Sequence, residues 1–362
     1  MPTRRLRDSL RAMLISLLLA SALAGPPKTS AEHREAFFDD VARRRQVDHP
    51  EADYRFYADL LHELAPLVEE RPGVLTVERI GRTVQGHRMW AFQVTDPSVQ
   101  VHQKVLVTAS IHPMEWVGAE VATDLLLELV ESPVPGVQVT VVPMLNVDGR
   151  LRVEKDLLDG VNRYWRTNSN GIDLNRDFAT NREAQAIWRH VIPRRYTTSS
   201  APLSQPESQA IDRLAQREDF DVAISFHAFG GYIYHPWAGL WERTPDEDRF
   251  AELGRVMQSG QGARAYRSMQ LSRWAFFFRG HGMELDHLYA EYGTLAFLIE
   301  LTRTGYRWKS LRADRKVDFR MYNPRDPNPD TERGVGAVRA LMRHLQDHPV
   351  EDSTTPTALA EP

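Results

Sequence analysis

Four short runs of apolar residues constrain the fold of this chain more than any other feature. They are KVLVTAS (104–110), VQVTVVPMLN (137–146), DVAISFH (221–227) and TLAFLIEL (294–301). Each run is continuous rather than alternating, which is typical of a strand buried on both faces. Segments with helical spacing separate them, such as EWVGAEVATDLLLELV (115–130) and PESQAIDRLAQRE (206–218). This order predicts a single α/β domain with a mixed, mostly parallel sheet and helices on both faces.

The remaining segments extend the same plan. Helical spacing runs from Tyr54 through LLHELAPLVEE, and the runs LTVERIG and HRMWAFQVT predict two strands joined by a turn. Further helices are predicted at EAQAIWRHVI, EDRFAELGRVMQSG and ERGVGAVRALMRHL. Residues 150–182, which are polar and arginine-rich, are predicted to be loop, as is the aromatic region 266–293. No linker divides the core, so we expect one domain over residues 50–346.

The two ends of the chain have a different composition. Residues 1–24 carry four arginines before a short apolar run and then small residues, which predicts a signal peptide. The apolar run is too short to cross a ~30 Å hydrocarbon core, so we expect export to the periplasm or outside the cell, with no stable membrane span. Residues 25–49 form a charged lead-in, and residues 347–362 form a polar tail predicted to be disordered.

Charge and cysteine content exclude several kinds of function. The chain has 45 basic and 49 acidic side chains, a balance that gives no reason to expect nucleic acid as a partner. It has no cysteine, which excludes thiol catalysis, thiolate ligands and disulfides. Any bound metal must therefore be held by histidine, carboxylate or carbonyl groups.

The pattern His-x-x-Glu is a candidate metal-binding pair, and context separates its copies. It occurs at His112/Glu115, His281/Glu284 and His348/Glu351. In open α/β sheets, ligands bind beyond the carboxyl ends of the strands. Only the first pair follows a buried strand, because the second lies in a glycine-bracketed loop and the third follows the last helix. The first pair is therefore the candidate site.

Two further strands end in residues of the same kind. His227 ends the strand 221–227, and Glu300 lies near the end of 294–301. Two histidines and one carboxylate would leave a fourth position of zinc open, as a catalytic site requires. The alternative is that His112, Glu115 and His227 only make hydrogen bonds at strand ends. For Glu300 that alternative is weaker, because an unpaired charge in an apolar strand is costly.

The loop between these strands supplies basic groups. RYWR contains Arg163 and Arg166, and GIDLNRDF contains Asn175 and Arg176. The planar guanidinium binds a carboxylate through two hydrogen bonds, which suits a substrate with a free terminal carboxylate. The alternative is that these arginines merely face solvent from a polar loop.

Taken together, the motifs resemble the zinc carboxypeptidases of the carboxypeptidase A/B type. The resemblance runs from about Tyr54 to Leu345. It includes, in the family's order, IGRTVQGHRMWAFQV, SIHPMEWVGAE, LNVDGR, NRYWR, GIDLNRDF, SFHAF and GMELDHLY...FLIEL. The resemblance implies an eight-stranded sheet, one zinc ion per chain and hydrolysis of the C-terminal peptide bond of peptides.

Matched position by position, the resemblance implies roles for the chemical groups. His112, Glu115 and His227 would bind zinc. Glu300 would be the general base that takes a proton from water and passes it to the leaving amine. Arg166 would stabilise the oxyanion together with zinc.

The resemblance also implies roles in binding the substrate and in orienting a ligand. Asn175 and Arg176 would hold the terminal carboxylate, and Arg163 would line the cleft. Asp173 would orient the first histidine ligand.

One residue of the family pattern is missing. The mobile tyrosine that covers the bound carboxylate is replaced by Phe278 or Trp274, depending on the direction of counting, and neither has a hydroxyl. Tyr289 or Tyr292 could supply one instead.

The base of the specificity pocket corresponds to Leu285, which favours apolar terminal residues, or to Glu284, which would favour lysine or arginine. Arg273, Arg279 and Arg303 nearby leave a third option, an acidic or cell-wall-derived terminal residue. We expect an apolar one.

Two other functions stay open. A zinc amidase acting on the stem peptides of peptidoglycan would share the fold and the metal. A binding protein without catalysis would keep only the site. We expect a monomer that acts on peptides with a free C-terminal carboxylate.

Overall fold

The computed structural model describes residues 29–51, 53–161, 163, 165–183, 188–191, 198–303 and 319–350. The predicted signal peptide and residues 351–362 of the predicted tail lie outside this part of the chain. Within it, no helix combines the length and the apolar character needed to cross a membrane.

Eight strands form one mixed sheet, which confirms the predicted fold class. The strands are β1 (Leu75–Arg82), β2 (Arg88–Val94), β3 (Gln103–Ala109), β4 (Val137–Val142), β5 (Val222–Ala228), β6 (Tyr232–His235), β7 (Arg267–Gln270) and β8 (Leu295–Leu301). Their order across the sheet is β1-β2-β4-β3-β5-β8-β6-β7. The four continuous apolar runs are the central strands β4, β3, β5 and β8, and these pair in parallel. Antiparallel strands flank them, as β2 on β4 and β6 on β8.

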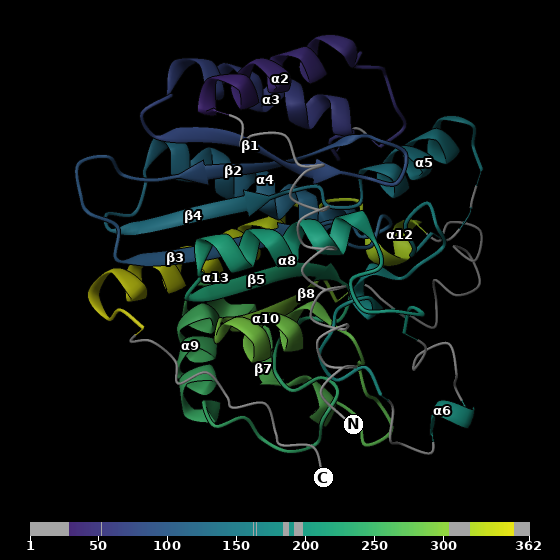
Figure 1. Cartoon of the computed structure of the whole chain (residues 1–362), viewed down its shortest axis with the longest axis vertical. Coiled ribbons are helices and arrows are strands. Elements are labelled where there is room, and N and C mark those ends of the chain that lie inside the picture. Colours follow the sequence, from purple (N-terminus) through teal and green to yellow (C-terminus); the bar gives the residue numbers. More distant parts are fainter. Residues whose placement is uncertain are drawn as a thin grey trace, which may run out of the picture.

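Helices cover both faces of this sheet. They are α2 (Ser30–Arg43), α3 (Tyr57–Glu70), α4 (Trp116–Glu131), α5 (Val147–Leu158), α6 (Trp188–Val191), α8 (Pro206–Glu218), α9 (Glu247–Ser259), α10 (Glu284–Tyr292), α12 (Phe319–Tyr322) and α13 (Asn328–Asp347). In Figure 1, α8 and α10 lie in front of the sheet, and the yellow helix α13 passes behind it. A helix between successive parallel strands is the connection that such a sheet requires.

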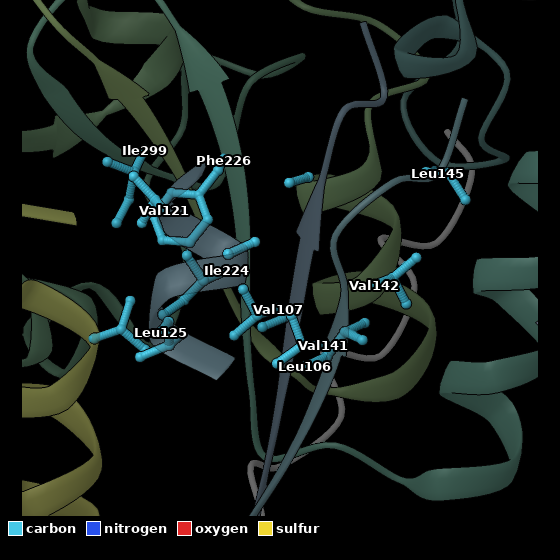
Figure 2. Packing of buried hydrophobic residues seen from close by; sticks show 14 of the residues in the cluster. Leu106, Val107, Val121, Leu125, Val141, Val142, Leu145, Ile224, Phe226 and Ile299 are labelled. Carbon is cyan, nitrogen blue, oxygen red and sulfur yellow. The ribbon is translucent and has the colours of Figure 1, made fainter. Parts of the chain in front are cut away.

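The core is continuous between the central strands and α4. Figure 2 shows apolar side chains of these elements packed together, among them Val107, Val121, Ile224, Phe226 and Ile299. Burying one such side chain contributes about 1.5–3 kcal/mol, so this layer holds the strand ends in fixed positions. Helix α4 approaches β5 closely at Gly118, where an added Cβ would lie 3.1 Å from the carbonyl oxygen of Phe226.

The loop prediction for residues 150–182 is wrong at its start, where α5 extends to Leu158. Asn146 caps this helix by accepting a hydrogen bond from the Gly149 N–H at 3.0 Å. Arg150 anchors it from inside: its guanidinium lies 3.2 Å from the ring centroid of Trp116 and donates to Glu154. The helix was missed because a buried arginine, not an apolar stripe, holds it in place.

The prediction of loop for residues 266–293 is wrong for β7 and α10, which both fall within it. The lead-in 25–49 also contains structure, the helix α2, which begins with a capping box between Thr29 and Glu32. Phe37 of α2 packs edge-on against Trp90 and Phe92, so this helix contributes to the core. At the other end of the domain, α13 ends at Asp347.

Candidate metal and catalytic site

The carboxyl ends of three parallel strands bring the candidate residues together. His112 follows β3, and Glu115 is the N-cap residue of α4. His227 lies near the end of β5 and is paired in register with Glu300 on the neighbouring strand β8. Because the two residues are direct neighbours across the sheet, their side chains project from the same face.

His112, Glu115 and His227 place their polar atoms around one point. His112 Nδ1 lies 2.9 Å from Glu115 Oε1, and His227 Nδ1 lies 3.0 Å from Glu115 Oε2. The two Nδ1 atoms are 3.1 Å apart. In the part of the chain that the structure describes, this is the group of histidine and carboxylate residues that could hold a metal.

These separations fit a tetrahedral zinc ion. With bonds of about 2.05 Å, two ligand atoms of a tetrahedral site lie roughly 3.3 Å apart. Two neutral imidazoles that both face this point with an unprotonated Nδ1 would present two lone pairs, which a bound cation would satisfy. All three side chains are buried, and neutral imidazole and carboxylate are donors that zinc accepts.

Asp173 connects the first histidine to an arginine. Its Oδ1 lies 3.1 Å from His112 Nε2, and its Oδ2 accepts a hydrogen bond of 2.7 Å from Arg166 Nε. Burial alone would raise the pKa of Asp173, but Arg166 and His112 hold this pKa well below its usual range. The ionised carboxylate therefore fixes the ring of His112 with Nδ1 toward the metal position.

Arg166 reaches the edge of the same site. Its Nη1 lies 3.9 Å from Glu115 Oε1, and about a third of its side chain is exposed. The guanidinium is thus held by Asp173 on one side, and the residue lines the cavity.

Glu300 is half-buried beside the metal position, and its Oε2 has no hydrogen-bond partner within the described residues. Burial, and then the charge of Glu115, raise the pKa of Glu300 to about 8. A carboxylate that titrates near neutral pH and lies in a cavity is suited to general-base catalysis.

A cavity of about 660 Å³ opens over these groups. Its polar wall includes Asn175 and Arg176, which lie in and around a short 3-10 helix, Leu174–Arg176. Arg176 Nη1 donates to the Asn175 carbonyl oxygen at 2.6 Å, and Asn175 Oδ1 accepts the Glu284 N–H at 2.9 Å. Its apolar wall includes Leu271, Trp274, Phe278, Met283 and Leu298.

Sequence comparison assigns this arrangement to a family. The sequence pattern of the zinc carboxypeptidase family matches residues 60–319 of the chain. The chain belongs to the zinc carboxypeptidase family.

Individual members of the zinc carboxypeptidase family are only distantly similar. Carboxypeptidase D of Mus musculus is 27% identical over 201 residues, which cover 51% of this chain and 13% of that protein. Carboxypeptidase A6 of the same organism is 23% identical over 277 residues, covering 70% of this chain and 61% of that protein. The chain thus spans only a small part of the length of carboxypeptidase D.

Two solved carboxypeptidase structures share the fold. Carboxypeptidase A from Helicoverpa armigera aligns with a TM-score of 0.62 at 16% identity, covering 92% of this chain and 87% of that one. Bovine thrombin-activatable fibrinolysis inhibitor, in complex with a tick carboxypeptidase inhibitor, aligns with a TM-score of 0.66 at 18% identity. That alignment covers 82% of this chain and 98% of the bovine chain.

Two residues predicted to contact substrate lie elsewhere. Arg163 is exposed and is not among the described residues that line the cavity. Leu285 is 1% exposed and is not among the described residues that line this cavity either, so its place at the base of a specificity pocket stays a prediction. Met283, the N-cap residue of α10, faces the cavity instead, because the first turn of that helix packs its side chains into the core.

Two tyrosines that line the cavity come from a strand. Tyr232 and Tyr234 on β6 both line the cavity, and their rings stack with centroids 5.1 Å apart. In the antiparallel register, Tyr232 lies opposite Glu300 and Tyr234 opposite Leu298. The alternation in YIYH after the third ligand was the sequence signal for this pair, and it was missed because the strand is short.

The tyrosines considered from the sequence are engaged elsewhere. Tyr289 donates to Asp246 at 2.7 Å, and Tyr292 donates to Asp212 at 2.6 Å. Trp274 and Phe278, the two candidates for the position of the missing tyrosine, both line the cavity.

Proposed function

We propose that this chain is a zinc-dependent metallocarboxypeptidase, which removes the C-terminal residue of peptides. The observation that carries the proposal is the position of Glu300. It lies in register with His227, next to the His-Glu-His group, and its Oε2 makes no hydrogen bond to any described residue. A metal-binding protein without catalysis would have no need for a carboxylate oxygen that is buried without a hydrogen-bond partner at this place, because such a group is costly.

The residues of the chain divide the chemistry among them. His112, Glu115 and His227 would hold zinc, which, when bound, polarises the scissile carbonyl and lowers the pKa of a coordinated water. Glu300 accepts the proton of the attacking water at its free oxygen and returns it to the leaving amine. The Arg166 guanidinium, fixed by Asp173, donates hydrogen bonds to the negative charge that develops on the carbonyl oxygen.

The cavity also indicates the kind of substrate. Arg176 and Asn175 present hydrogen-bond donors to a terminal carboxylate. Leu271, Met283 and Leu298 line the same cavity with apolar surface, which favours an apolar C-terminal side chain. Glu284, the alternative for selecting a basic residue, is 2% exposed and does not line the described cavity.

The test combines metal analysis with a digest of a C-terminal peptide library, read by mass spectrometry. We expect one zinc per chain and stepwise loss of apolar C-terminal residues. A matched series of C-terminally amidated peptides should resist cleavage, because they lack the carboxylate that Arg176 binds. Cleavage of muropeptides alone would favour a peptidoglycan amidase. Stoichiometric zinc without cleavage of either class would favour a binding protein.

We propose export as well, on the basis of the composition of residues 1–24. N-terminal sequencing of the mature protein from the producing cell is the test. A mature chain that still begins at Met1 would contradict it.

A further inference from the structure

Glu284 is a buried acid that the proposed mechanism does not use. It belongs to one of the rejected His-x-x-Glu pairs, and it opens α10 with its carboxylate directed at the sheet. Oε2 accepts a hydrogen bond of 2.7 Å from Ser225 Oγ, and Oε1 accepts one of 3.0 Å from Thr108 Oγ1. Ser225 and Thr108 are paired in register on β5 and β3 and lie 3.1 Å apart through their hydroxyl oxygens.

Ser225 connects this acid to a metal ligand. It lies two residues before His227 on β5, so both side chains project from the same face. Ser225 Oγ is 3.3 Å from His227 Nε2, the ring nitrogen opposite the Nδ1 that faces Glu115. All four side chains of this chain of contacts are buried: Thr108, Glu284, Ser225 and His227.

Donor and acceptor counting fixes where the protons lie. A hydroxyl has one proton, and Ser225 gives it to Glu284 because a carboxylate can only accept. Ser225 must then accept from His227, which places the imidazole proton on Nε2 and leaves the lone pair of Nδ1 toward the metal position. This assignment holds for the ionised Glu284, and a neutral Glu284 keeps it when its proton lies on Oε1, toward Thr108.

We propose that Glu284, acting through Ser225, is a positioning residue that holds His227 in the tautomer and orientation needed to bind zinc. It parallels Asp173, which accepts directly from His112 Nε2. The two histidine ligands would thus each be oriented by a carboxylate, one directly and one through a serine. This inference rests on the proposed zinc site.

The same residue supports the substrate side of the site. The Glu284 N–H donates to Asn175 Oδ1 at 2.9 Å, which turns the Asn175 amide so that its NH₂ group is available for a ligand. The start of α10 therefore holds both a metal ligand and a residue of the carboxylate-binding wall.

The experiment compares Ser225→Ala with Thr108→Val. Both remove one buried hydroxyl that bonds to Glu284, but only Ser225→Ala removes the acceptor of the His227 Nε2 proton. Zinc affinity is measured by chelator competition on the purified full-length chain, and cobalt-substituted protein gives a visible spectrum that reports on the ligands. We expect Ser225→Ala to weaken zinc binding about 10- to 100-fold and to change the cobalt spectrum. Thr108→Val should stay within about threefold of wild type, with an unchanged spectrum.

A second variant covers a failure of Ser225→Ala to fold. Glu284→Gln keeps the shape, and its amide oxygen can still accept from Ser225 in one of two orientations, so we expect a smaller loss of about 3- to 10-fold. Wild-type affinity within twofold in every variant that folds would overturn the proposal. Equal losses in Ser225→Ala and Thr108→Val would also overturn it, since that result indicates general loosening of the core. If the wild-type chain itself binds no zinc, the proposed function fails instead.

Discussion

Replacing Glu300 by glutamine tests the proposed reaction most directly. The substitution keeps the shape of the side chain and removes its ability to accept a proton. Because Glu300 Oε2 makes no hydrogen bond to any described residue, the change leaves no described donor without its acceptor. Neither Glu300 oxygen belongs to the His-Glu-His group, so zinc binding should persist.

The expected magnitude follows from the role of the side chain. A positioned general base contributes roughly 10²–10⁴ in rate, which corresponds to about 3–5.5 kcal/mol of transition-state stabilisation. Since the carboxylate has no partner to lose in the described ground state, the loss should appear in kcat while KM changes little. Residual hydrolysis would come from the metal and from Arg166.

The assay measures kcat and KM on a blocked dipeptide with an apolar C-terminal residue, together with zinc content and the melting temperature. Glu78→Gln is the matched control, because Glu78 lies on β1 in an exposed ion pair with Arg217. It should leave all of these quantities unchanged. Near-wild-type kcat in Glu300→Gln, with zinc bound and the fold intact, would refute the assignment of the base.

Four further substitutions test other parts of the structure. Arg176→Ala should lower kcat/KM about 10- to 100-fold for free carboxylates, as expected for a charged hydrogen bond, and a fall below threefold in steady-state kinetics would contradict this. Tyr234→Phe should raise KM by about 2- to 10-fold if its hydroxyl binds substrate, and an unchanged KM would show that only the ring matters. Burial lowers the pKa of His235 from 6.5 to about 4, so the unfolded chain binds a proton in this interval that the folded chain does not. The free energy of unfolding should therefore fall as pH decreases from 7 to 4, by about 3 kcal/mol more in wild type than in His235→Gln. Urea unfolding that gives the same decrease in both proteins would contradict this. Gly118→Ala should destabilise the fold by about 1–3 kcal/mol, because the new Cβ meets the backbone of Phe226, and a melting temperature equal to wild type would show that α4 can move away.

The fold could be predicted from the sequence because its central strands are unusually clear. A continuous apolar strand has few alternatives, and the helices between such strands require parallel pairing. Elements held by contacts of aromatic rings with distant segments of the chain were missed. Helix α5 depends on the buried Arg150 stacked on Trp116, and α2 depends on Phe37 reaching Trp90. No local periodicity encodes contacts of that kind.

The sequence by itself determined the residues that meet at the site. His112, Glu115, His227 and Glu300 lie at or near the carboxyl ends of buried parallel strands, and the topology of such a sheet brings these ends to one edge.

The tertiary structure alone decided what surrounds the site. Successive residues of an α-helix point about 100° apart. At the start of α10, three consecutive side chains therefore point in different directions: Met283 lines the cavity, Glu284 contacts Ser225 and Leu285 lies in the core. The position of Tyr234 depends likewise on the register of β6 against β8. The side-chain directions at the start of α10 and the register of β6 both depend on packing between segments far apart in the chain. The summed energy of many such contacts favours one arrangement over the others.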